Sequence, residues 1–383
     1  MQLVDDRLLR PHEIQFRDVV REFVTREIEP HAGEWDRQGA FPRELLSRFG
    51  QMGWLGTAFP EEVGGAAGGS VLHALLCAEL ARGSASVTLS AYVHTALACA
   101  AVLHLGNDEQ RQRILPAALR GETLGCWAYA EPGAGADVSS VATRARRDEG
   151  GYLLDGSKLY ITNAPDADFA VVVASTAPER RLKGMSLFVV SRDNPGMRIG
   201  RPMEKLGMGA SSIAEIVFDG CRVPLEDRLG PEGTGFLQAL KVLTLGRISA
   251  ASFGVGLGRA AYGAALGYTR ERIQFGRPLL DQQFVRFTLA DMATRLQAAW
   301  QLVLVAARLA DSGQRHDTEA SMAKLFATET CTWACERALH LCGAQGYMLE
   351  SPAQRFYRDC KVLEFGEGTS EIMRETIARG LEV

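Results

Sequence analysis

The segment FLQALKVLTLGRISAASFGVGLGRAAYGAALGYTRERI, residues 236–273, decides the fold. It contains no proline, its apolar residues recur at helical spacing, and glycine, alanine and serine occur along its whole length. Small side chains on a helix allow the backbones of neighbouring helices to approach closely. We therefore predict one long helix at the centre of a helical bundle.

Two more long helices are expected after it. Residues 281–313 place an apolar stripe on one helix face and end at Gly313, and residues 318–343 form a helix that ends at Gly343. The first long helix contains the stretch GVGLGRAA (254–261). Within it, Gly256, Gly258 and Ala261 loosely match a dinucleotide-binding fingerprint. That fingerprint needs a strand before it and a helix that opens after it, so we interpret the match as helix packing. The stripe on residues 281–313 consists of Phe284, Phe287, Met292, Leu296, Trp300 and Leu304.

The chain before the bundle divides into a helical part and a β part. Residues 13–30 show the helical spacing of the first part, and Pro30 ends that run. From about Gly121 the segments become short, rich in valine, isoleucine and phenylalanine, and separated by turn residues, as strands are. Residues 151–164 look like a hairpin around Asp155–Gly156. We predict an α+β multidomain protein with an all-α domain (1–121), a β domain (122–229) and a helical bundle domain (230–383).

Composition excludes several classes of function. The net charge of −4 indicates no nucleic-acid partner, and no apolar run approaches the ~18 residues that a membrane span needs. The eight scattered cysteines are typical of buried thiols in a reducing compartment, and neither Cys331 with Cys335 nor the histidines form a metal-binding pattern. The N-terminus lacks the apolar region of a secretory signal. We expect a cytoplasmic protein without a bound metal, and its arginine-rich basic residues suggest a bacterial source.

Two short stretches have two readings each. In EFGEGTSEIM (364–373), Glu367 stands between two glycines and is followed by Thr369 and Ser370, which suits either a helix cap or a catalytic base on a tight turn. In YAEPGAGAD (129–137), small residues follow a strand, which suits either a ligand-binding loop or a plain surface turn. The residues alone leave both questions open.

Six segments, taken together and in this order, resemble the acyl-CoA dehydrogenase family over nearly the whole chain. They are GWLGTAFPEEVGG (53–65), RILPAALRGETLGCWAYAEPGAGAD (113–137), GSKLYITNA (156–164), RERIQFGRPL (270–279), HLCGAQGY (340–347) and YRDCKVLEFGEGTSEI (357–372). The resemblance implies an N-terminal helical domain, a middle β-barrel-like domain and a C-terminal four-helix bundle. It also implies FAD as the cofactor and a homotetramer or homodimer in which a neighbouring subunit holds part of the FAD.

The resemblance further implies the chemistry. Family members remove the Cα proton of an acyl thioester with a carboxylate while FAD N5 takes the Cβ hydride, and an electron-transfer flavoprotein is the expected acceptor. Glu367 would be the base, with Gly366 and Gly368 beside it and Arg247 near the active site. Some branches carry the base at the position that matches Gly246, which cannot serve here. The acyl group would be carried by CoA or by an acyl-carrier protein.

The flavin contacts follow from the same resemblance, position by position. Ala136 would contact flavin phosphate or substrate, and it replaces a usual serine. Gly366 replaces a usual aromatic residue, which would open space in the acyl pocket. The remaining cofactor-binding candidates are Trp127, Tyr129, Ala130, Tyr160, Thr162, Arg272, Gln274, Phe275, Gln283, His340, Gly343, Thr369 and Glu371.

Two alternatives remain at this point. One is a flavin oxidase or monooxygenase on the same fold, whose members usually lack the glutamate. The other is a non-catalytic flavoprotein, such as a DNA-binding relative, which the net charge of −4 disfavours. The sequence leaves the acyl chain length, the carrier and the electron acceptor open.

Overall fold

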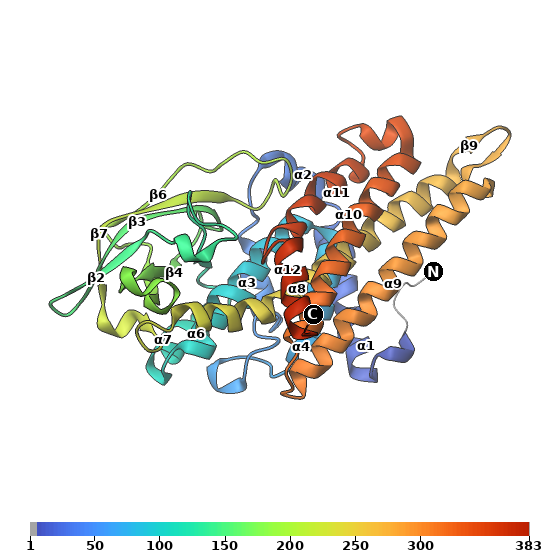
Figure 1. Ribbon diagram of the computed structural model, residues 1–383. Helices are drawn as coiled ribbons and strands as arrows, with labels where there is room; N and C mark the ends of the chain where they lie inside the picture. Colours follow the sequence, from blue (N-terminus) through green and yellow to red (C-terminus); the bar gives the residue numbers. More distant parts are fainter. Residues whose placement is uncertain (1–5, 383) are drawn as a thin grey trace.

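The structure is a computed structural model that describes residues 6–382. Helices occupy both ends of the chain, and the strands of the main sheet lie between them, at one end of an elongated molecule (Figure 1). This order agrees with the predicted N-terminal helical, middle β and C-terminal helical arrangement. We keep the boundaries at 121 and 229 as a proposal.

The N-terminal region consists of short helices, two of which continue into π-helical turns. The predicted run from residue 13 ends at Ile28, just before Pro30. The helices are α1 (Pro11–Phe23), α2 (Ala32–Gln38), α3 (Glu44–Gln51), α4 (Gly69–Gly83), α5 (Ala85–Tyr92), α6 (Ala100–Leu105) and α7 (Asp108–Leu119), with π-helical turns at Val24–Ile28 and Val93–Cys99.

The middle region forms one eight-stranded sheet with the order β6-β7-β3-β2-β4-β5-β8, and β1 pairs in parallel with β4. The prediction of a hairpin around Asp155–Gly156 was wrong. The turn lies at Glu149–Gly150, and β3 continues through Gly156, whose φ of 144° fits a bulge in the pairing with β7. The strands are β1 (Gly125–Ala128), β2 (Arg144–Asp148), β3 (Gly151–Thr162), β4 (Phe169–Ser175), β5 (Met185–Ser191), β6 (Met197–Ile199), β7 (Ile213–Pro224) and β8 (Arg228–Leu229).

The C-terminal region is built on three long helices. A short hairpin of β9 (Ile273–Gln274) and β10 (Arg277–Pro278) joins α8 to α9, at the end of the molecule opposite the main sheet (Figure 1). α10 runs past the predicted stop because Gly343, at φ 57°, breaks the helix without ending it. The helices are α8 (Gly235–Glu271), α9 (Gln283–Asp311), α10 (Asp317–Tyr347), α11 (Pro352–Cys360) and α12 (Ser370–Gly380).

The stripe predicted on α9 is only partly buried. Met292, Leu296, Trp300 and Leu304 are in the core, but Phe284 and Phe287 are each 59% exposed. The reason is their position in the first turns of α9, next to the hairpin, where α9 projects beyond the helices that cover its later turns (Figure 1).

Close packing of glycines holds α8 against its neighbours, as predicted for the segment 254–261. A Cβ on Gly256 would lie 2.0 Å from the Ala78 carbonyl oxygen of α4, and a Cβ on Gly254 would lie 3.1 Å from the Ala327 carbonyl oxygen of α10. The fingerprint-like glycines therefore serve helix packing. Two helical stretches, Ala85–Leu105 and Gly235–Glu271, are long and apolar enough to cross a membrane, but their apolar windows are 89% and 78% buried within the protein.

The glycine packing gives a stability prediction. Gly256→Ala should lower the free energy of unfolding by about 1–3 kcal/mol, because the added methyl group forces the α8 and α4 backbones apart. The matched control is Gly263→Ala on an exposed face of α8, where a Cβ meets nothing within 4 Å. That change should raise stability by about 0.5–1 kcal/mol through helix propensity. Thermal and urea unfolding of both variants would measure the difference, and equal effects would contradict the packing.

Candidate active site

Glu367 lies on a tight turn between two helical segments. The chain leaves a 3₁₀ turn at Lys361–Glu364 and enters α12 at Ser370, where the Thr369 side chain accepts a hydrogen bond from Ile372 N at 3.3 Å. Glu367 has φ 58°, a left-handed conformation that is uncommon for a residue with a side chain, and Gly368 follows at φ 93°. Such strain persists only where the surroundings fix the backbone.

The buried Lys324 of α10 fixes this turn. Its Nζ donates to the Gly368 carbonyl at 2.7 Å and to the Glu364 carbonyl at 3.3 Å, so both sides of the turn are tied to one ammonium group. Lys324 is 0% exposed, and burial lowers the pKa of its ammonium group to about 8. A cation is therefore held behind the Glu367 turn without a direct salt bridge to it.

The Glu367 carboxylate is enclosed although the residue as a whole is only partly buried. Its Oε2 atom is buried and has no hydrogen-bond partner. Burial raises the pKa of the carboxyl group to about 7, and the Tyr92 hydroxyl, Lys324 and Arg247 oppose that rise only in part. A carboxylate with a pKa near neutrality suits a general base.

The long helix α8 packs directly against this carboxylate. A Cβ on Gly246 would lie 2.9 Å from Glu367 Oε2, 3.2 Å from Leu97 Cδ2 and 3.4 Å from the Tyr92 hydroxyl. Arg247 follows on α8, is 6% exposed and donates through Nη1 to the Ser321 hydroxyl at 3.1 Å, while its Nε has no partner. The structure thus brings Gly246 and Arg247 together with Glu367.

A second wall of the site comes from β1, the loop after it and β3. The Trp127 and Tyr129 rings stack at 6.0 Å with an interplanar angle of 14°, and Trp127 packs in the same apolar cluster as Tyr92 and Leu97. Leu159 N donates to Ala130 O at 2.9 Å, which joins the loop to β3. Tyr160 on β3 is 65% exposed at φ 59°, and Thr162 ends the strand.

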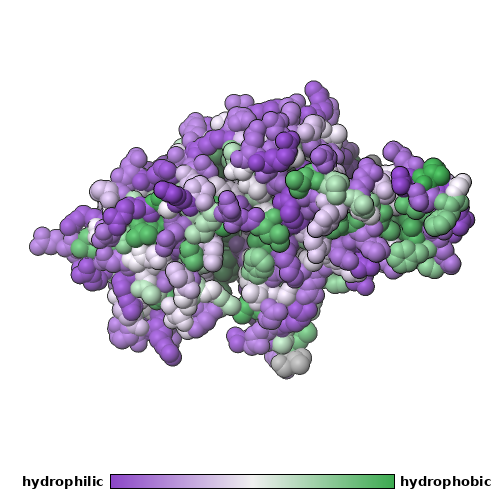
Figure 2. All heavy atoms as spheres, turned by 90° about the horizontal axis from the view of Figure 1, so that it is seen from above, coloured by the Kyte–Doolittle hydropathy of each residue, from purple (hydrophilic) through white to green (hydrophobic). Residues whose placement is uncertain are grey.

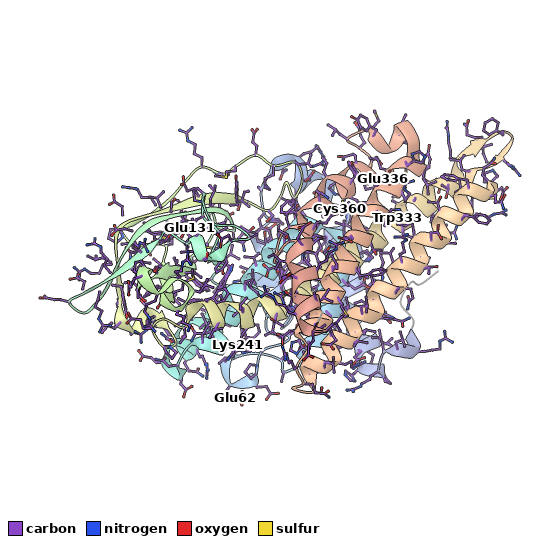
Figure 3. The ribbon with its side chains drawn as sticks, viewed as in Figure 1. Glu62, Glu131, Lys241, Trp333, Glu336 and Cys360 are labelled. Atoms are coloured by element: carbon purple, nitrogen blue, oxygen red, sulfur yellow. The ribbon has the colours of Figure 1, made fainter. Side chains whose placement is uncertain are left out.

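A buried ion pair fixes this wall. Lys158 Nζ, on a side chain that is 0% exposed, contacts Glu131 Oε1 at 2.7 Å and the Tyr129 carbonyl at 3.1 Å. Glu131, labelled among the strands in Figure 3, also accepts hydrogen bonds from the backbone of Ala142 and Thr143. Charge-assisted contacts on all sides of the pair hold the 129–134 loop on β3.

The other predicted site residues lie elsewhere on this chain. Ala136 is exposed on the loop after β1, and Gly366 and Gly368 flank Glu367. Glu371 is exposed in the first turn of α12, and Thr369 caps that helix, as the capping interpretation had it. Six further cofactor-binding candidates lie toward the α8–α9 hairpin or on α10, at a distance from β3: Arg272, Gln274, Phe275, Gln283, His340 and Gly343.

Comparison with known proteins decides the family. The acyl-CoA dehydrogenase N-terminal domain matches residues 10–122, the middle domain residues 126–221 and the C-terminal domain residues 233–382. The chain belongs to the acyl-CoA dehydrogenase family. It is therefore similar to oxidoreductases that act on CH–CH donors, and FAD is the cofactor of this family.

Similar proteins cover nearly the whole chain. An acyl-CoA dehydrogenase of Bacillus subtilis is 40% identical over 369 residues, covering 96% of this chain and 97% of that protein. The short-chain specific acyl-CoA dehydrogenase of Rattus norvegicus mitochondria is 38% identical over 362 residues, covering 94% and 88%. Butyryl-CoA dehydrogenase of Megasphaera elsdenii has a structure with a TM-score of 0.95, 31% identity and coverage of 98% and 99%.

Two further structures concern the cofactor and the electron acceptor. A glutaryl-CoA dehydrogenase from Mycobacterium smegmatis, solved with FADH2, has a TM-score of 0.93 and 30% identity over 98% of this chain and 96% of that one. A chain from a structure of the electron transferring flavoprotein of Acidaminococcus fermentans has a TM-score of 0.95 and 34% identity over 97% of this chain and 98% of that one.

The residues of this family member fit a flavin. The Tyr129 hydroxyl is buried without a partner, and a Cβ on Gly133 or Gly135 would meet nothing within 4 Å. The exposed aromatic ring of Tyr160 lies on the same wall. A flat aromatic ligand with polar edges matches such a combination of open loop, aromatic rings and unpaired hydroxyl.

Sequence reasoning missed three parts of this site. Lys324 and Tyr92 received no role, and the pair of Lys158 with Glu131 was overlooked. A signal was available for Lys324 because a lysine occurs within the helical run 318–343, where a buried lysine needs a partner. Tyr92 gave little signal, since a tyrosine among small apolar residues is ordinary core.

The position of Lys324 gives a prediction about pH dependence. Lys324→Met removes a cation that lowers the pKa of Glu367, so that pKa should rise and the acidic limb of the kcat/KM profile should move to higher pH. Two backbone carbonyls would also lose their donor, which should lower the free energy of unfolding by about 1–3 kcal/mol.

The matched control is Lys361→Met, whose partly exposed side chain pairs with Glu364 on the same turn. That variant should keep the wild-type pH profile and change stability by less than about 1 kcal/mol. An acidic limb that does not move in Lys324→Met would contradict an electrostatic role for Lys324.

Proposed function

We propose that the protein oxidises the acyl group of an acyl-CoA to the α,β-unsaturated thioester, with Glu367 as the base that takes the Cα proton. One observation carries the proposal. The Glu367 carboxylate has an enclosed, unpartnered oxygen, a pKa raised to about 7, and the α8 backbone packed directly against it at Gly246.

The chemistry explains why these features matter together. A Cα proton next to a thioester is weakly acidic, so a carboxylate of raised pKa is a better base than an exposed one, and near neutral pH much of it is still ionised. The Glu367 N–H would donate to the thioester carbonyl and stabilise the charge that develops there. When bound, FAD supplies the acceptor for the Cβ hydride.

Within one chain, we assign the flavin to the wall built by Trp127, Tyr129, Ala130, Tyr160 and Thr162, with Ala136 toward the phosphates. The supporting observation is the fixed position of that wall on the Lys158–Glu131 pair. Arg247 would act on the substrate side, next to Gly246, and Thr369 and Glu371 would close the site behind Glu367.

A second copy of the chain would complete the cofactor site. The hairpin that carries Arg272, Gln274 and Phe275 ends in apolar side chains, and Figure 2 shows hydrophobic atoms gathered at that end of the molecule. Phe275 is 93% exposed, Ile273 53%, and Phe284 and Phe287 59% each. Apolar surface of this extent favours association, and we propose a homodimer or homotetramer in which the hairpin, Gln283, His340 and Gly343 face the neighbour's flavin.

The remaining parts of the proposal concern the partners. We propose CoA as the carrier and an electron-transfer flavoprotein as the acceptor, because the similar proteins carry those names, and we place the reaction in the cytoplasm of a bacterium. An acyl-carrier protein and molecular oxygen are the competing carrier and acceptor, and the experiment below includes both.

The decisive variant is Glu367→Gln. It should retain the flavin spectrum but lose about 10²–10⁴-fold in the rate of flavin bleaching by acyl-CoA under anaerobic conditions. The matched control is Glu375→Gln, an exposed partner of Arg379 on α12, which should bleach at the wild-type rate. Flavin bleaching at the wild-type rate in Glu367→Gln would rule out Glu367 as the base. Oxygen consumption during turnover would identify molecular oxygen as the acceptor, and bleaching only by acyl-carrier protein thioesters would identify that protein as the carrier.

The same variant has a stability signature. Because the pKa of Glu367 is raised from 4.5 to about 7, the folded protein binds more protons than the unfolded chain between those values. The contribution of protonated Glu367 to the stability of the fold is complete below pH 4.5 and is lost as the pH rises through about 7. The thermal stability of Glu367→Gln relative to wild type should therefore increase with pH over that interval.

The hairpin gives a prediction about assembly. Phe275→Asp places a charge on the most exposed apolar side chain of the hairpin, so it should shift the protein toward monomers and lower the flavin content per chain. Val19→Asp on α1, at a position that is 54% exposed, is the matched control and should leave both unchanged. Light scattering after size-exclusion chromatography measures the mass, and a stable oligomer with full flavin content in Phe275→Asp would contradict the proposed interface.

A further inference from the structure

Tyr92 is a buried tyrosine that faces the proposed base. It ends α5, is 4% exposed, and its hydroxyl is buried without a hydrogen-bond partner. That hydroxyl nevertheless lies close enough to the Glu367 carboxylate for each group to shift the pKa of the other. A tyrosine hydroxyl that is buried usually has a partner, so this one is available to a ligand or to Glu367.

Three side chains meet at one point beside α8. The missing Cβ of Gly246 marks a position within 3.4 Å of Glu367 Oε2, Leu97 Cδ2 and the Tyr92 hydroxyl. The Glu367 carboxylate, the Leu97 side chain and the Tyr92 hydroxyl therefore pack together against the α8 backbone, so closely that an added methyl group at Gly246 would require a shift. Any group that extends from Glu367 toward the protein interior meets Tyr92.

A cavity lies behind Tyr92. It measures about 10 Å³, close to the size that a single water needs, and its walls come from α3, the loop after α3, α4, α5 and the π-helical turn Val93–Cys99. Tyr92 lines it together with Thr88, Thr95, Cys77 and His73. Burial lowers the pKa of His73 to about 4 and raises that of Cys77 to about 12, so the cavity carries no charge near neutral pH.

The direction of the substrate follows from its polarity. CoA is large and anionic, so the thioester end must face solvent, and the acyl tail must point inward from the carbon that Glu367 deprotonates. On that path the tail would meet the Tyr92 side chain, and the cavity that Tyr92 lines is too small for a chain of several methylene groups. Gly366 has no side chain, so the turn itself would not narrow the pocket.

We propose that Tyr92 is the inner wall of the acyl pocket, which restricts the enzyme to compact acyl groups, and that its hydroxyl is a positioning group for Glu367. The inference rests on the proposed function and adds the substrate class: short or branched acyl thioesters. Because the pKa of Tyr92 is raised well above its ordinary value, first by burial and then by Glu367, the phenol stays protonated and donates toward the carboxylate.

The hydroxyl is one of three groups that stabilise ionised Glu367. Tyr92 approaches from α5, Lys324 from α10 and Arg247 from α8, and all three lower the pKa of the carboxyl group. Removing the hydroxyl should therefore raise that pKa while both cations remain. Removing the ring should enlarge the pocket by joining it to the cavity behind.

Three variants separate these effects. Tyr92→Phe keeps the ring and removes the hydroxyl. Tyr92→Ala removes the ring and opens the pocket. Tyr92→Leu also removes the ring but retains an apolar side chain, and it replaces Tyr92→Ala if that variant is unstable. The control is Tyr357→Ala on α11, whose side chain is partly exposed. Anaerobic flavin bleaching with butyryl-, isobutyryl-, octanoyl- and dodecanoyl-CoA gives the chain-length profile, and binding of unreactive thioether analogues of the same lengths gives a readout that needs no turnover.

Wild type and Tyr357→Ala should prefer butyryl- or isobutyryl-CoA, and Tyr92→Ala and Tyr92→Leu should shift the preference toward octanoyl-CoA by about tenfold or more. Tyr92→Phe should keep the wild-type chain-length profile while the acidic limb of its kcat/KM profile moves to higher pH. A wild-type preference for dodecanoyl-CoA, or a chain-length profile that is the same in all Tyr92 variants, would contradict Tyr92 as the inner wall. An acidic limb that does not move in Tyr92→Phe would contradict the positioning role of the hydroxyl.

Failure of the proposed function would look different. If no thioester bleached the flavin of the wild-type protein, the proposed dehydrogenase activity would be wrong. Tyr92 as the inner wall would still be supported if binding of the thioether analogues depended on chain length in wild type and less so in Tyr92→Ala. If bleaching occurred and depended on Glu367 but the analogues bound alike in all variants, only the inference about Tyr92 would fail.

Discussion

The close approach of backbones along α8 is the constraint on which the rest of the structure depends. Gly254, Gly256 and Gly258 would each place a Cβ against a different helix, namely α10, α4 and α9. At such distances even one methyl group cannot be accommodated without a shift, because protein interiors are close-packed. The three contacts fix α8 relative to both helical regions, and α8 in turn spans the molecule from the sheet to the α8–α9 hairpin (Figure 1). The lack of a side chain at Gly246 also lets the Glu367 carboxylate pack against this helix, since a Cβ there would lie 2.9 Å from Oε2.

The site on this frame depends on buried charge. Lys324 and Lys158 are 0% exposed, and each is held by carbonyl or carboxylate oxygens that offset its loss of hydration. Glu367 is different, because its Oε2 lacks a partner and burial raises its pKa to about 7. The same enclosure that makes the carboxylate a stronger base opposes its ionisation in the folded protein. Strain at φ 58° adds to that cost, and such features are maintained only where the surrounding packing is rigid.

The sequence predicted the fold to the extent that local patterns decide it. Helical spacing placed α8, α9 and α10, and the change to short β-rich segments placed the sheet between the two helical regions. The pattern failed where tertiary context overrides local preference. Asp155–Gly156 has the composition of a hairpin turn, yet pairing with β7 carries β3 through it, and Phe284 and Phe287 fit the apolar stripe but lie beyond the helices that would cover them.

The site was less predictable than the fold, for a reason that Tyr92 illustrates. The roles given to Glu367 and the flavin residues came from resemblance, since a glutamate between glycines is compatible with a cap as well as a base. Tyr92 and Lys324 lie 275 and 43 residues before Glu367 in the chain, and no periodicity relates them to it. Only the packing of α5 and α10 around α8 brings the three side chains together.

The arrangement around Gly246 shows how a shared reaction can acquire a preference in one chain. Proton removal depends on Glu367, on the turn that carries it and on the Lys324 ammonium group that fixes this turn, so changes to these parts should impair the reaction. The boundary of the pocket is formed by side chains that do not hold the turn, so its depth can vary while the carboxylate stays in place. Tyr92 belongs to both sets, because its ring would bound the acyl pocket and its hydroxyl lies beside the base. A larger pocket made by shortening this residue would therefore also change the proton affinity of Glu367, so that acyl-chain preference and pH dependence are coupled in this protein.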